Sequence, residues 1–534
     1  MNLITDKWIP VLRKNGKDTI RPCQIVEKEN PVIVINAPRP DFKGAIYQFL
    51  IGLLQTCHPP EDEDEWLYYW REQPELETLK KAFDNVKDAF ELYSSDGPAF
   101  MQEYGGLEGK PEPLGSLLIE APGKNTIYKN IDLFQKRYRF NCMCESCTAM
   151  TLYTLQINAP PGGAGHMAGL RGNGPLTTVI VEQGIRDNIF RSLWLNILPH
   201  NDVYESFDLL NSHIFPWLDK TKTSESCTTK KCKNGCEKCG IFPQEYNELQ
   251  YFWPMPRRLR ILSCDREGEC ELCGAQSKLF KQYITKPNGI RYVGGWIHPL
   301  TPYHKDSEKL PNPIKGEKAG NCYQHWVGLV LQDTDRKYHA AKVVSSYLDD
   351  KSFQINEDSS VALWCFGFDM EPGQAKARCW YEQILPLFYL EKDQKKNLID
   401  WANELIVAAR DIIKILRDQV KQALFRRPGD VKGDMSIIDS QFWQTTEPEF
   451  YKILNKLAKL PGNTRIAPPE IYESWLKTLE KSVFILFEKS ALESIPEDID
   501  FKRVMAAKNI LKKKFYNNKI IKSLKAKATY EEEA

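Results

Sequence analysis

Two pairs of cysteines with the spacing Cys-x-x-Cys are separated by the whole segment from residue 148 to residue 269. The pairs are Cys144 with Cys147 and Cys270 with Cys273. A two-residue spacer lets both sulfurs of a pair face one ion, and two pairs supply the four thiolates of a tetrahedral zinc site. Such a closed site leaves no position for water. The pairs therefore predict a structural zinc ion that joins two distant parts of the chain, and a redox pair is the weaker alternative.

A second group of cysteines lies in a polar, lysine-rich insertion at residues 219–240. Its members are Cys227, Cys232, Cys236 and Cys239. This segment has too few apolar residues to form a core of its own, so a second zinc ion is its natural organiser. The alternative is a loop with unligated cysteines.

Composition favours a cytoplasmic protein of two domains. The chain has 534 residues, of which 42% are hydrophobic, and this combination is typical of folded domains. No apolar run approaches the ~20 residues needed to cross a membrane, and residues 1–10 lack the apolar core of a signal peptide. Disulfides are disfavoured in that reducing compartment. The formal net charge is +1, so any nucleic-acid surface must come from a local arrangement of charge.

Hydrophobic patterning divides the chain near residue 389. Residues 1–388 mix short strand-like and helical runs, which predicts an α+β domain. Residues 389–534 begin with one apolar stripe at helical spacing, and further helical stretches follow at 447–460, 468–492 and 499–524. Helices with short connections predict a C-terminal four-helix bundle. The alternative is a helical extension of the first domain. The stripe consists of Leu398, Trp401, Leu405, Ala409, Ile412, Leu416 and Val420.

Two further segments are candidates for ligand contact. The glycine-rich run at residues 159–165 would let its backbone approach a ligand closely, although it lacks the lysine of a P-loop and is by itself most often a plain loop. Residues 502–527 contain ten basic residues and no acidic one. They form either a solvated helical face or a surface for nucleic-acid phosphates. Nucleophile-elbow, zinc-protease and kinase signatures are absent.

Several motifs occur in an order that resembles the CasA family, the large subunits of type I-E CRISPR Cascade surveillance complexes. They are Asn2-Leu-Ile-Thr-Asp-Lys-Trp-Ile-Pro-Val11, Gly97-Pro-Ala-Phe-Met-Gln102, Cys144-x-x-Cys147-Thr-Ala149, Ala159-Pro-Pro-Gly162, Gly169-Leu-Arg-Gly172, Pro175-x-Thr-Thr178, Cys270-x-x-Cys273-Gly274 and His298-Pro-x-Thr-Pro302. The resemblance implies an α+β N-terminal domain with zinc and a C-terminal four-helix bundle. It also implies a protein without catalytic activity that reads the protospacer-adjacent motif (PAM) on double-stranded DNA, starts the R-loop and recruits the CRISPR helicase-nuclease.

The same resemblance implies partners and site residues. The partners are the backbone, small and guide-end-binding subunits of Cascade, the crRNA, duplex target DNA and the helicase-nuclease; no membrane is involved. The residues that match the family's PAM-reading glycine loop are Pro161, Gly162, Gly163, Ala164 and Gly165. Lys286 matches a lysine that reaches the minor groove, Gly373 and Gln374 match the wedge that splits the first base pairs, and Tyr128, Lys129 and Asn130 match a loop that contacts guide and DNA.

Two other classes of function remain open from the residues alone. A zinc-dependent nuclease would need a metal with an open coordination position, which knuckles made only of cysteine do not provide. A zinc-stapled DNA-binding scaffold or regulator would bind duplex DNA without partners, whereas a Cascade subunit would bind it only weakly when alone.

Overall fold

The computed structural model describes residues 1–130, 140–163, 165–183, 188–200, 208–225, 240–263, 266–306, 309–316, 323–331, 337–355, 361–371, 376–430, 435–492 and 500–529. The chain divides into two compact units. The first unit comprises residues 1–316 and 334–384, and the second comprises residues 317–333 and 385–534. The second unit therefore takes a short segment from the interior of the sequence as well as the C-terminal residues.

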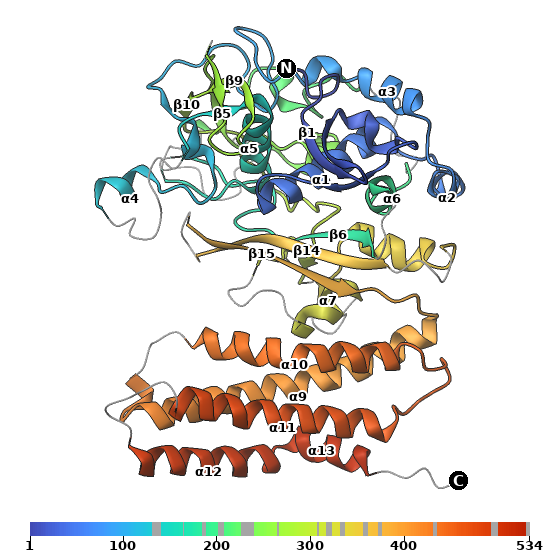
Figure 1. Ribbon diagram of the computed structural model, residues 1–534, viewed down its shortest axis with the longest axis vertical. Coiled ribbons are helices and arrows are strands. Elements are labelled where there is room, and N and C mark those ends of the chain that lie inside the picture. Colours follow the sequence, from blue (N-terminus) through green and yellow to red (C-terminus); the bar gives the residue numbers. More distant parts are fainter. Residues whose placement is uncertain are drawn as a thin grey trace. The chain divides into compact units, whose positions relative to one another are not determined.

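The first unit is built around two buried helices, α1 (Pro40–Cys57) and α5 (Glu145–Asn158), which pack against each other (Figure 1). Most residues on every side of both helices are buried. A helix that is apolar on all faces belongs in the interior of a domain. Among the described residues of this unit, the other α-helices are α2 (Glu63–Arg71), α3 (Leu76–Asp84), α4 (Lys124–Tyr128), α6 (Ile189–Trp194) and α8 (Lys342–Ser346).

Aromatic rings fill the space beside α1. Phe49 of α1 lies edge-on to Trp8, Tyr153 and Trp253, with ring centroids 5.2 to 5.6 Å apart. Edge-to-face pairs at this spacing add stabilisation to the burial of their area. Because Tyr153 belongs to α5, this cluster fixes α5 against α1 as well.

Small three-stranded sheets surround these helices. Their strands, in the order of each sheet, are β2 (Gly16–Ile20), β1 (Ile9–Arg13) and β3 (Val32–Ile35); β4 (Glu112–Pro113), β10 (Gln282–Lys286) and β7 (Arg258–Ile261); β5 (Met143–Cys144), β9 (Gln276–Phe280) and β8 (Glu267–Glu269); β12 (Asn312–Pro313), β11 (Tyr303–His304) and β13 (Tyr338–His339); and β15 (Ala377–Pro386), β14 (Val361–Met370) and β6 (Thr177–Glu182). The pairs β1–β2, β7–β10 and β6–β14 are antiparallel. This mixture of helices and small antiparallel sheets confirms the predicted α+β class.

A buried arginine ties the glycine-rich region to the core of the first unit. Arg171 is 2% exposed, and its guanidinium donates hydrogen bonds to Gln48 Oε1 of α1, at 2.9 Å, and to Thr177 Oγ1 of β6, at 2.8 Å. Burial lowers the pKa of this guanidinium to about 10. A buried cation costs free energy unless every donor is satisfied, so these bonds fix the chain around residue 171.

The second unit consists of the helices α7 (Trp326–Val330), α9 (Lys392–Leu424), α10 (Ser436–Leu457), α11 (Pro469–Leu492), α12 (Phe501–Asn517) and α13 (Lys519–Ala528) in the part of the chain that the structure describes (Figure 1). The long helix α9 packs against α10, α11 and α12. All seven residues of the predicted apolar stripe are buried in α9. The stripe is therefore the core-facing side of that helix, as its spacing predicts.

Two helix boundaries differ from those expected from the sequence. Helix α10 begins at Ser436 rather than near residue 447 and contains Pro448. Thr445 and Thr446, which precede the proline, donate side-chain hydrogen bonds to the backbone carbonyls of Gln441 and Phe442. The stretch expected at 499–524 is two helices, because Asn518 breaks it. Its Oδ1 accepts hydrogen bonds from Ile520 N and Ile521 N and caps α13.

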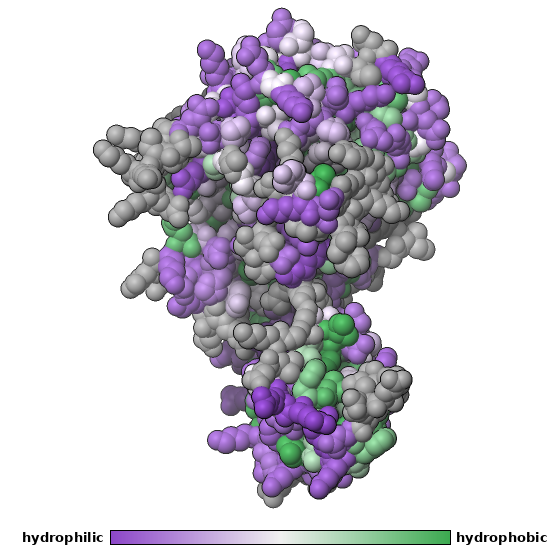
Figure 2. Space-filling model, turned by 90° about the vertical axis from the view of Figure 1, so that its left-hand side faces the viewer, coloured by the Kyte–Doolittle hydropathy of each residue, from purple (hydrophilic) through white to green (hydrophobic). Residues whose placement is uncertain are grey.

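None of the helices among the described residues is long and apolar enough to span a membrane. Hydrophilic side chains cover most of the coloured surface in Figure 2, and apolar ones occur in small groups between them. This pattern is ordinary for a protein surface in water.

Candidate metal centre and adjoining glycine loop

The first pair of cysteines lies where strand β5 leads into helix α5. Cys144 is the last residue of β5 and caps α5, since its sulfur accepts a hydrogen bond from the backbone amide of Cys147 at 3.4 Å. Thr151 Oγ1 donates to the carbonyl of Cys147 at 2.8 Å. Because Cys144 and Cys147 are both buried, the fold fixes both sulfurs of this pair at the start of the helix.

The second pair lies in the turn between strands β8 and β9. The amide of Gly274 donates to the carbonyl of Cys270 at 2.8 Å, and the amide of Cys270 donates to the carbonyl of Ala275 at 2.9 Å. Gly274 has a φ of +77°, which side chains other than glycine rarely adopt. Strand β9 pairs with β5 through Cys144 and Leu279. This pairing brings the second turn against the first.

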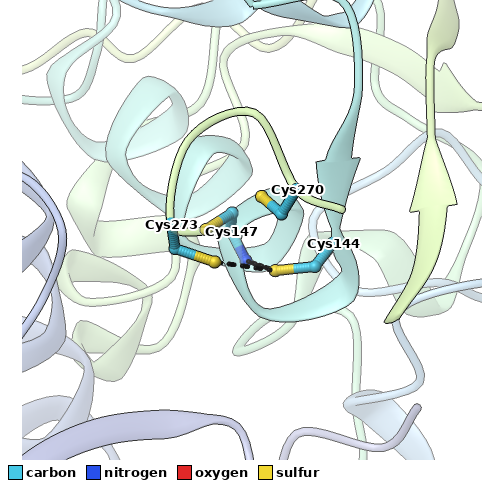
Figure 3. Close-up of side chains that lie close together, drawn as sticks. All are labelled: Cys144, Cys147, Cys270 and Cys273. Carbon is cyan, nitrogen blue, oxygen red and sulfur yellow. Dashed lines mark hydrogen bonds between the residues drawn. The ribbon is translucent and has the colours of Figure 1, made fainter. Parts of the chain in front are cut away.

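The four sulfurs lie within 4.8 Å of one another (Figure 3). The Cys144 and Cys273 sulfurs are 3.7 Å apart, which is too long for a disulfide bond of about 2.05 Å. A tetrahedral zinc ion with zinc–sulfur bonds of about 2.3 Å requires sulfurs about 3.8 Å apart. Cys144, Cys147 and Cys270 are buried and Cys273 is exposed. The donor set and its spacing therefore fit one four-thiolate metal ion, with no ligand position left for water.

Hydrogen bonds among the sulfurs shift the pKa values of the four thiols in different directions. Contact with Cys144, and then with Cys147, lowers the pKa of Cys273 to about 7. Contact with Cys144 and burial raise the pKa of the Cys147 thiol far above its ordinary value. Four neighbouring thiolates repel one another strongly, so a divalent cation is what would stabilise all of them in the ionised state.

Helix α5 connects this centre to the glycine loop, residues 159–165. The helix has 14 residues, from Glu145 to Asn158, and is about 21 Å long. The loop follows its last residue directly. Gly162 N donates to the carbonyl of His166 at 3.0 Å, which closes a short turn. The cysteine pair and the predicted DNA-contacting loop therefore occupy the two ends of one buried helix.

The glycines of this loop have different surroundings. A Cβ atom at Gly165, whose φ is +82°, would lie 2.4 Å from Asn288 Oδ1. A Cβ atom at Gly162 would lie 2.6 Å from the His166 Cβ. At Gly163 a Cβ atom would meet nothing within 4 Å, and this residue is exposed. Gly162 and Gly165 thus shape the loop, whereas Gly163 presents bare backbone to the solvent.

The strand that ends in the predicted lysine is joined to the glycine loop by a backbone hydrogen bond. Lys286 is the last residue of β10, and the amide of Asn288, two residues further on, donates to the carbonyl of Gly165 at 2.8 Å. Lys286 is partly exposed and forms no ion pair with any described residue. The structure thus brings together the loop and the end of β10, which are far apart in the sequence.

Arg257 lies beneath the loop. Its Nη2 donates to the carbonyl of Pro160, and its backbone amide donates to Gln156 Oε1 of α5 at 3.0 Å. Its Nε is buried without a hydrogen-bond partner among the described residues. Burial lowers the pKa of this guanidinium to about 10. Arg257 therefore supports the loop from below and adds positive charge there.

Of the other predicted contact residues, three lie at the end of α4, and the rest lie outside the described residues. Tyr128, Lys129 and Asn130 are exposed at the end of α4, and the Tyr128 side chain is 86% exposed. Ala164 of the glycine loop, Gly373 and Gln374 lie outside the described residues. So does the second cysteine group, Cys227, Cys232, Cys236 and Cys239.

Sequence reasoning did not identify Arg257 and Asn288 as loop-supporting residues. Asn288 has a φ of +62° in Pro287-Asn288-Gly289, a turn signal visible in the sequence. Nothing in the spacing of Arg257 indicates its contact with Pro160, because that contact joins two segments that are about a hundred residues apart in the sequence.

Comparisons with known proteins agree with this architecture. A family model described as CRISPR-associated protein Cse1 matches residues 2–486. A structure of Thermus thermophilus CasA (Cse1) is similar with a TM-score of 0.66 and 14% sequence identity, over 96% of this chain and 99% of that chain. The Thermobifida fusca Cse1 crystal structure has a TM-score of 0.67 and 13% identity, over 99% of each chain. A chain of a structure titled "CRISPR RNA-guided surveillance complex" has a TM-score of 0.65 and 12% identity, over 97% of this chain and 99% of that chain.

Proposed function

The chain belongs to the CRISPR-associated protein Cse1 family, and from this premise we propose that it is the large subunit of a type I-E Cascade surveillance complex. Its fold likeness to a chain of an RNA-guided surveillance complex supports this role. In this role it assembles with the backbone, small and guide-end-binding subunits and with crRNA. Sequence specificity then comes from pairing between guide and target, and the protein reads only a short motif beside the target.

The glycine loop and Lys286 read the PAM in duplex DNA. The observation that carries this proposal is the hydrogen bond from Asn288 N to Gly165 O, at 2.8 Å, because it joins the loop to the strand that ends in Lys286. Backbone without side chains can approach the floor of the narrow minor groove, and a lysine can donate to the acceptors there. Since those acceptors are nearly the same for A·T and T·A pairs, such a site would tolerate several related motifs.

Gln374 starts the R-loop by entering the base stack below the PAM. The described residues on either side support this proposal, because Glu371 N donates to Lys376 O at 2.9 Å and closes the end of the β14–β15 hairpin. Glutamine can enter a stack without burying a charge. Unstacking costs a few kcal/mol per base step, which motif binding and guide pairing must offset.

Tyr128, Lys129 and Asn130 contact the guide and the DNA beside it.

Zinc at Cys144, Cys147, Cys270 and Cys273 is structural in this proposal. When bound, it would stabilise the four thiolates in the ionised state and join the start of α5 to the β8–β9 turn. The residues of the protein position the loop. Strands β5 and β9 pair beside the cysteines, α5 runs from the first cysteine pair to the glycine loop, and Arg257 donates a hydrogen bond to that loop. A nuclease or hydrolase is less well supported, because four thiolates leave no open metal position for water.

A binding experiment with the assembled, guide-loaded complex tests this function. Its affinity should be measured for duplex targets with and without a PAM and for single-stranded target, beside the affinity of this chain alone. We expect tight binding to the PAM duplex by the complex and weak binding by the lone chain. Equal affinity of the lone chain would identify a regulator that acts without partners. The same complex, once it has formed the R-loop, recruits the helicase-nuclease. Cleavage of the target DNA measures this recruitment.

A further inference from the structure

Helices α12 and α13 carry a concentrated positive surface that the proposed PAM site does not use. We define the lysine face as six lysines that are all exposed: Lys512, Lys513, Lys514, Lys519, Lys522 and Lys525. They fall within 14 consecutive residues of a chain whose formal net charge is only +1. No acidic residue occurs between residues 501 and 530. The lysine face is therefore a strong local departure from the overall charge balance.

Packing of the two helices directs these lysines outward. Val504, Ala507, Leu511 and Phe515 are buried on one side of α12, and Ile521 and Leu524 are buried on one side of α13. Helix α12 packs against α9, and α13 packs against α11. Because the apolar residues fix the rotation of each helix, the lysines between them must point to solvent. Asn518 lies between the two helices and caps the start of α13.

The acidic groups that pair with basic residues of α12 and α13 all pair with residues beside the lysine face. Lys508 pairs with Glu488 of α11 at 2.6 Å, and Lys527 pairs with Glu404 of α9 at 2.5 Å. Arg503 pairs with Asp500 at 3.7 Å. None of the six lysines of the face forms an ion pair with a described residue. Their charge is therefore available to an external anion. Glu531, Glu532 and Glu533 follow in the sequence, outside the described residues.

We infer that the lysine face binds the phosphate backbone of duplex DNA. The inference rests on the proposed function, which brings a long duplex to this subunit. Duplex DNA presents one negative charge per about 1.7 Å of axis, and lysines that approach it release condensed counterions. The surface is the outer side of two helices, and the aromatic Tyr516 beside it is held by a hydrogen bond to Glu480. A single strand would need an aromatic stacking platform, so duplex is the form of DNA that this surface fits.

The contacts are independent of sequence, because lysines recognise phosphates as point charges. The lysine face would therefore add affinity for duplex with or without a PAM. It would leave the preference for the PAM unchanged. This separates its contribution from that of the glycine loop and Lys286.

The test compares two fourfold variants in the assembled, guide-loaded complex. In the first, Lys513, Lys514, Lys519 and Lys522 are replaced by Gln. In the matched control, four exposed lysines elsewhere in the second unit are replaced by Gln. None of them forms an ion pair with a described residue: Lys396, Lys456, Lys459 and Lys481. Both variants lose the same charge. Affinity for PAM duplex and PAM-free duplex is measured over a range of salt concentrations, with single-stranded target as a reference.

We expect the lysine-face variant to bind both duplexes roughly tenfold more weakly and to reduce the slope of log K against log salt by about 2 or more. The control should stay close to the wild-type complex. Equal losses in both variants, or no loss in the first, would overturn the inference. So would release of the variant subunit from the complex, which would identify an acidic protein surface as the partner. If the wild-type complex itself fails to bind duplex target, the proposed function fails, and the inference fails with it.

Discussion

The backbone amide of Asn288 donates a hydrogen bond of 2.8 Å to the carbonyl oxygen of Gly165. This bond joins a loop at the end of a helix to a turn at the end of a strand, across more than a hundred residues of sequence. The helix begins at Cys144 and Cys147, and the strand follows the hairpin that carries Cys270 and Cys273. The two elements are therefore held together at both ends, once by the cysteines and once by the loop.

Zinc content is the first prediction. Purified protein should contain one zinc ion bound by Cys144, Cys147, Cys270 and Cys273, and a second if the cysteines of residues 227–239 bind one. Replacement of Cys144 and Cys147 by Ser should remove one ion and lower the thermal midpoint. Elemental analysis and thermal unfolding measure these effects. Cys379→Ser, an exposed cysteine outside the group, serves as the control. Full metal retention after the double replacement would contradict the assignment.

The metal should also be lost more readily at low pH. Binding requires four thiolates, and protons compete for all of them. The pKa of Cys147 is raised in the metal-free protein, so affinity should fall as pH decreases through the neutral range. Dialysis against a chelator at several pH values, followed by elemental analysis, measures this. Metal retention that does not depend on pH would argue against thiolate ligands.

Substitution of the loop residue Gly163 should weaken DNA binding without affecting folding. A leucine there meets no neighbouring atom within 4 Å of its Cβ, yet it would keep the backbone away from a groove floor. Gly163→Leu should weaken PAM-dependent binding by the assembled complex roughly tenfold, a loss of about 1.4 kcal/mol. Gly429→Leu, another site with open space, should have no effect. An unchanged affinity of Gly163→Leu would place PAM contact elsewhere.

Removal of the Lys286 charge should weaken binding to PAM duplex with little change in stability. The lysine forms no ion pair with described residues, so its replacement leaves no buried partner unsatisfied. A charge-assisted hydrogen bond is worth about 1.5 to 3 kcal/mol, and Lys286→Ala should lower affinity by roughly one order of magnitude or more. Lys278→Ala, on the preceding strand β9, is the matched control. The same loss on PAM-free single strands would indicate a general role in affinity.

Gln374→Ala should slow opening of matched duplex. The wedge is needed only while the first base pairs are intact, so targets pre-melted by mismatches beside the PAM should bind at nearly the wild-type rate. Stopped-flow fluorescence of a base analogue beside the PAM follows the opening. A variant that opens matched duplex at the wild-type rate would exclude Gln374 as the wedge. Met370 is a poor alternative candidate for the wedge, because its side chain is buried with Phe368 and Ala377.

A buried lysine should make the stability of the first unit depend on alkaline pH. Lys351 is 1% exposed, donates to Ile197 O at 2.8 Å and lies 4.6 Å above the Trp66 ring. Burial lowers its pKa to about 8 from 10.5. Between these values the unfolded chain binds more protons, so this group contributes stability that increases as pH rises from 8 to 10.5, by up to about 3 kcal/mol. Thermal midpoints of wild type and Lys351→Met at pH 8 and 10 should show this increase only for the wild type.

The sequence predicts best where a local rule determines the structure. Cysteine spacing identified the four residues that the fold brings together, because a Cys-x-x-Cys pair is a metal-binding pattern that can be recognised without knowing the fold. The apolar stripe of α9 identified its buried face, because helical periodicity is local. The class of the first unit followed from mixed short runs of apolar residues.

Long-range packing was not visible in the same way. Tyr323 lies far from α10 in sequence, yet its ring stacks on Phe450 with centroids 4.3 Å apart, and its hydroxyl lies 2.9 Å from Thr446 Oγ1. No period or motif marks residues 323–331 as part of the helical unit. Likewise, Arg257 and Asn288 support the glycine loop because the residue before β7 contacts the end of α5 and the turn after β10 contacts the loop itself. Such contacts depend on tertiary structure and have no local signature.

Helix α5 also sets a constraint on how this protein can change in evolution. One residue inserted into or deleted from an α-helix turns everything beyond it by about 100° and shifts it by about 1.5 Å. Since Cys144 and Cys147 are fixed at one end of α5 and the glycine loop at the other, such a change would point the loop away from Asn288. Substitutions along α5 can be compensated by neighbouring side chains, but a change in its length cannot. We therefore expect relatives to differ in the sequence of this helix far more readily than in its number of residues.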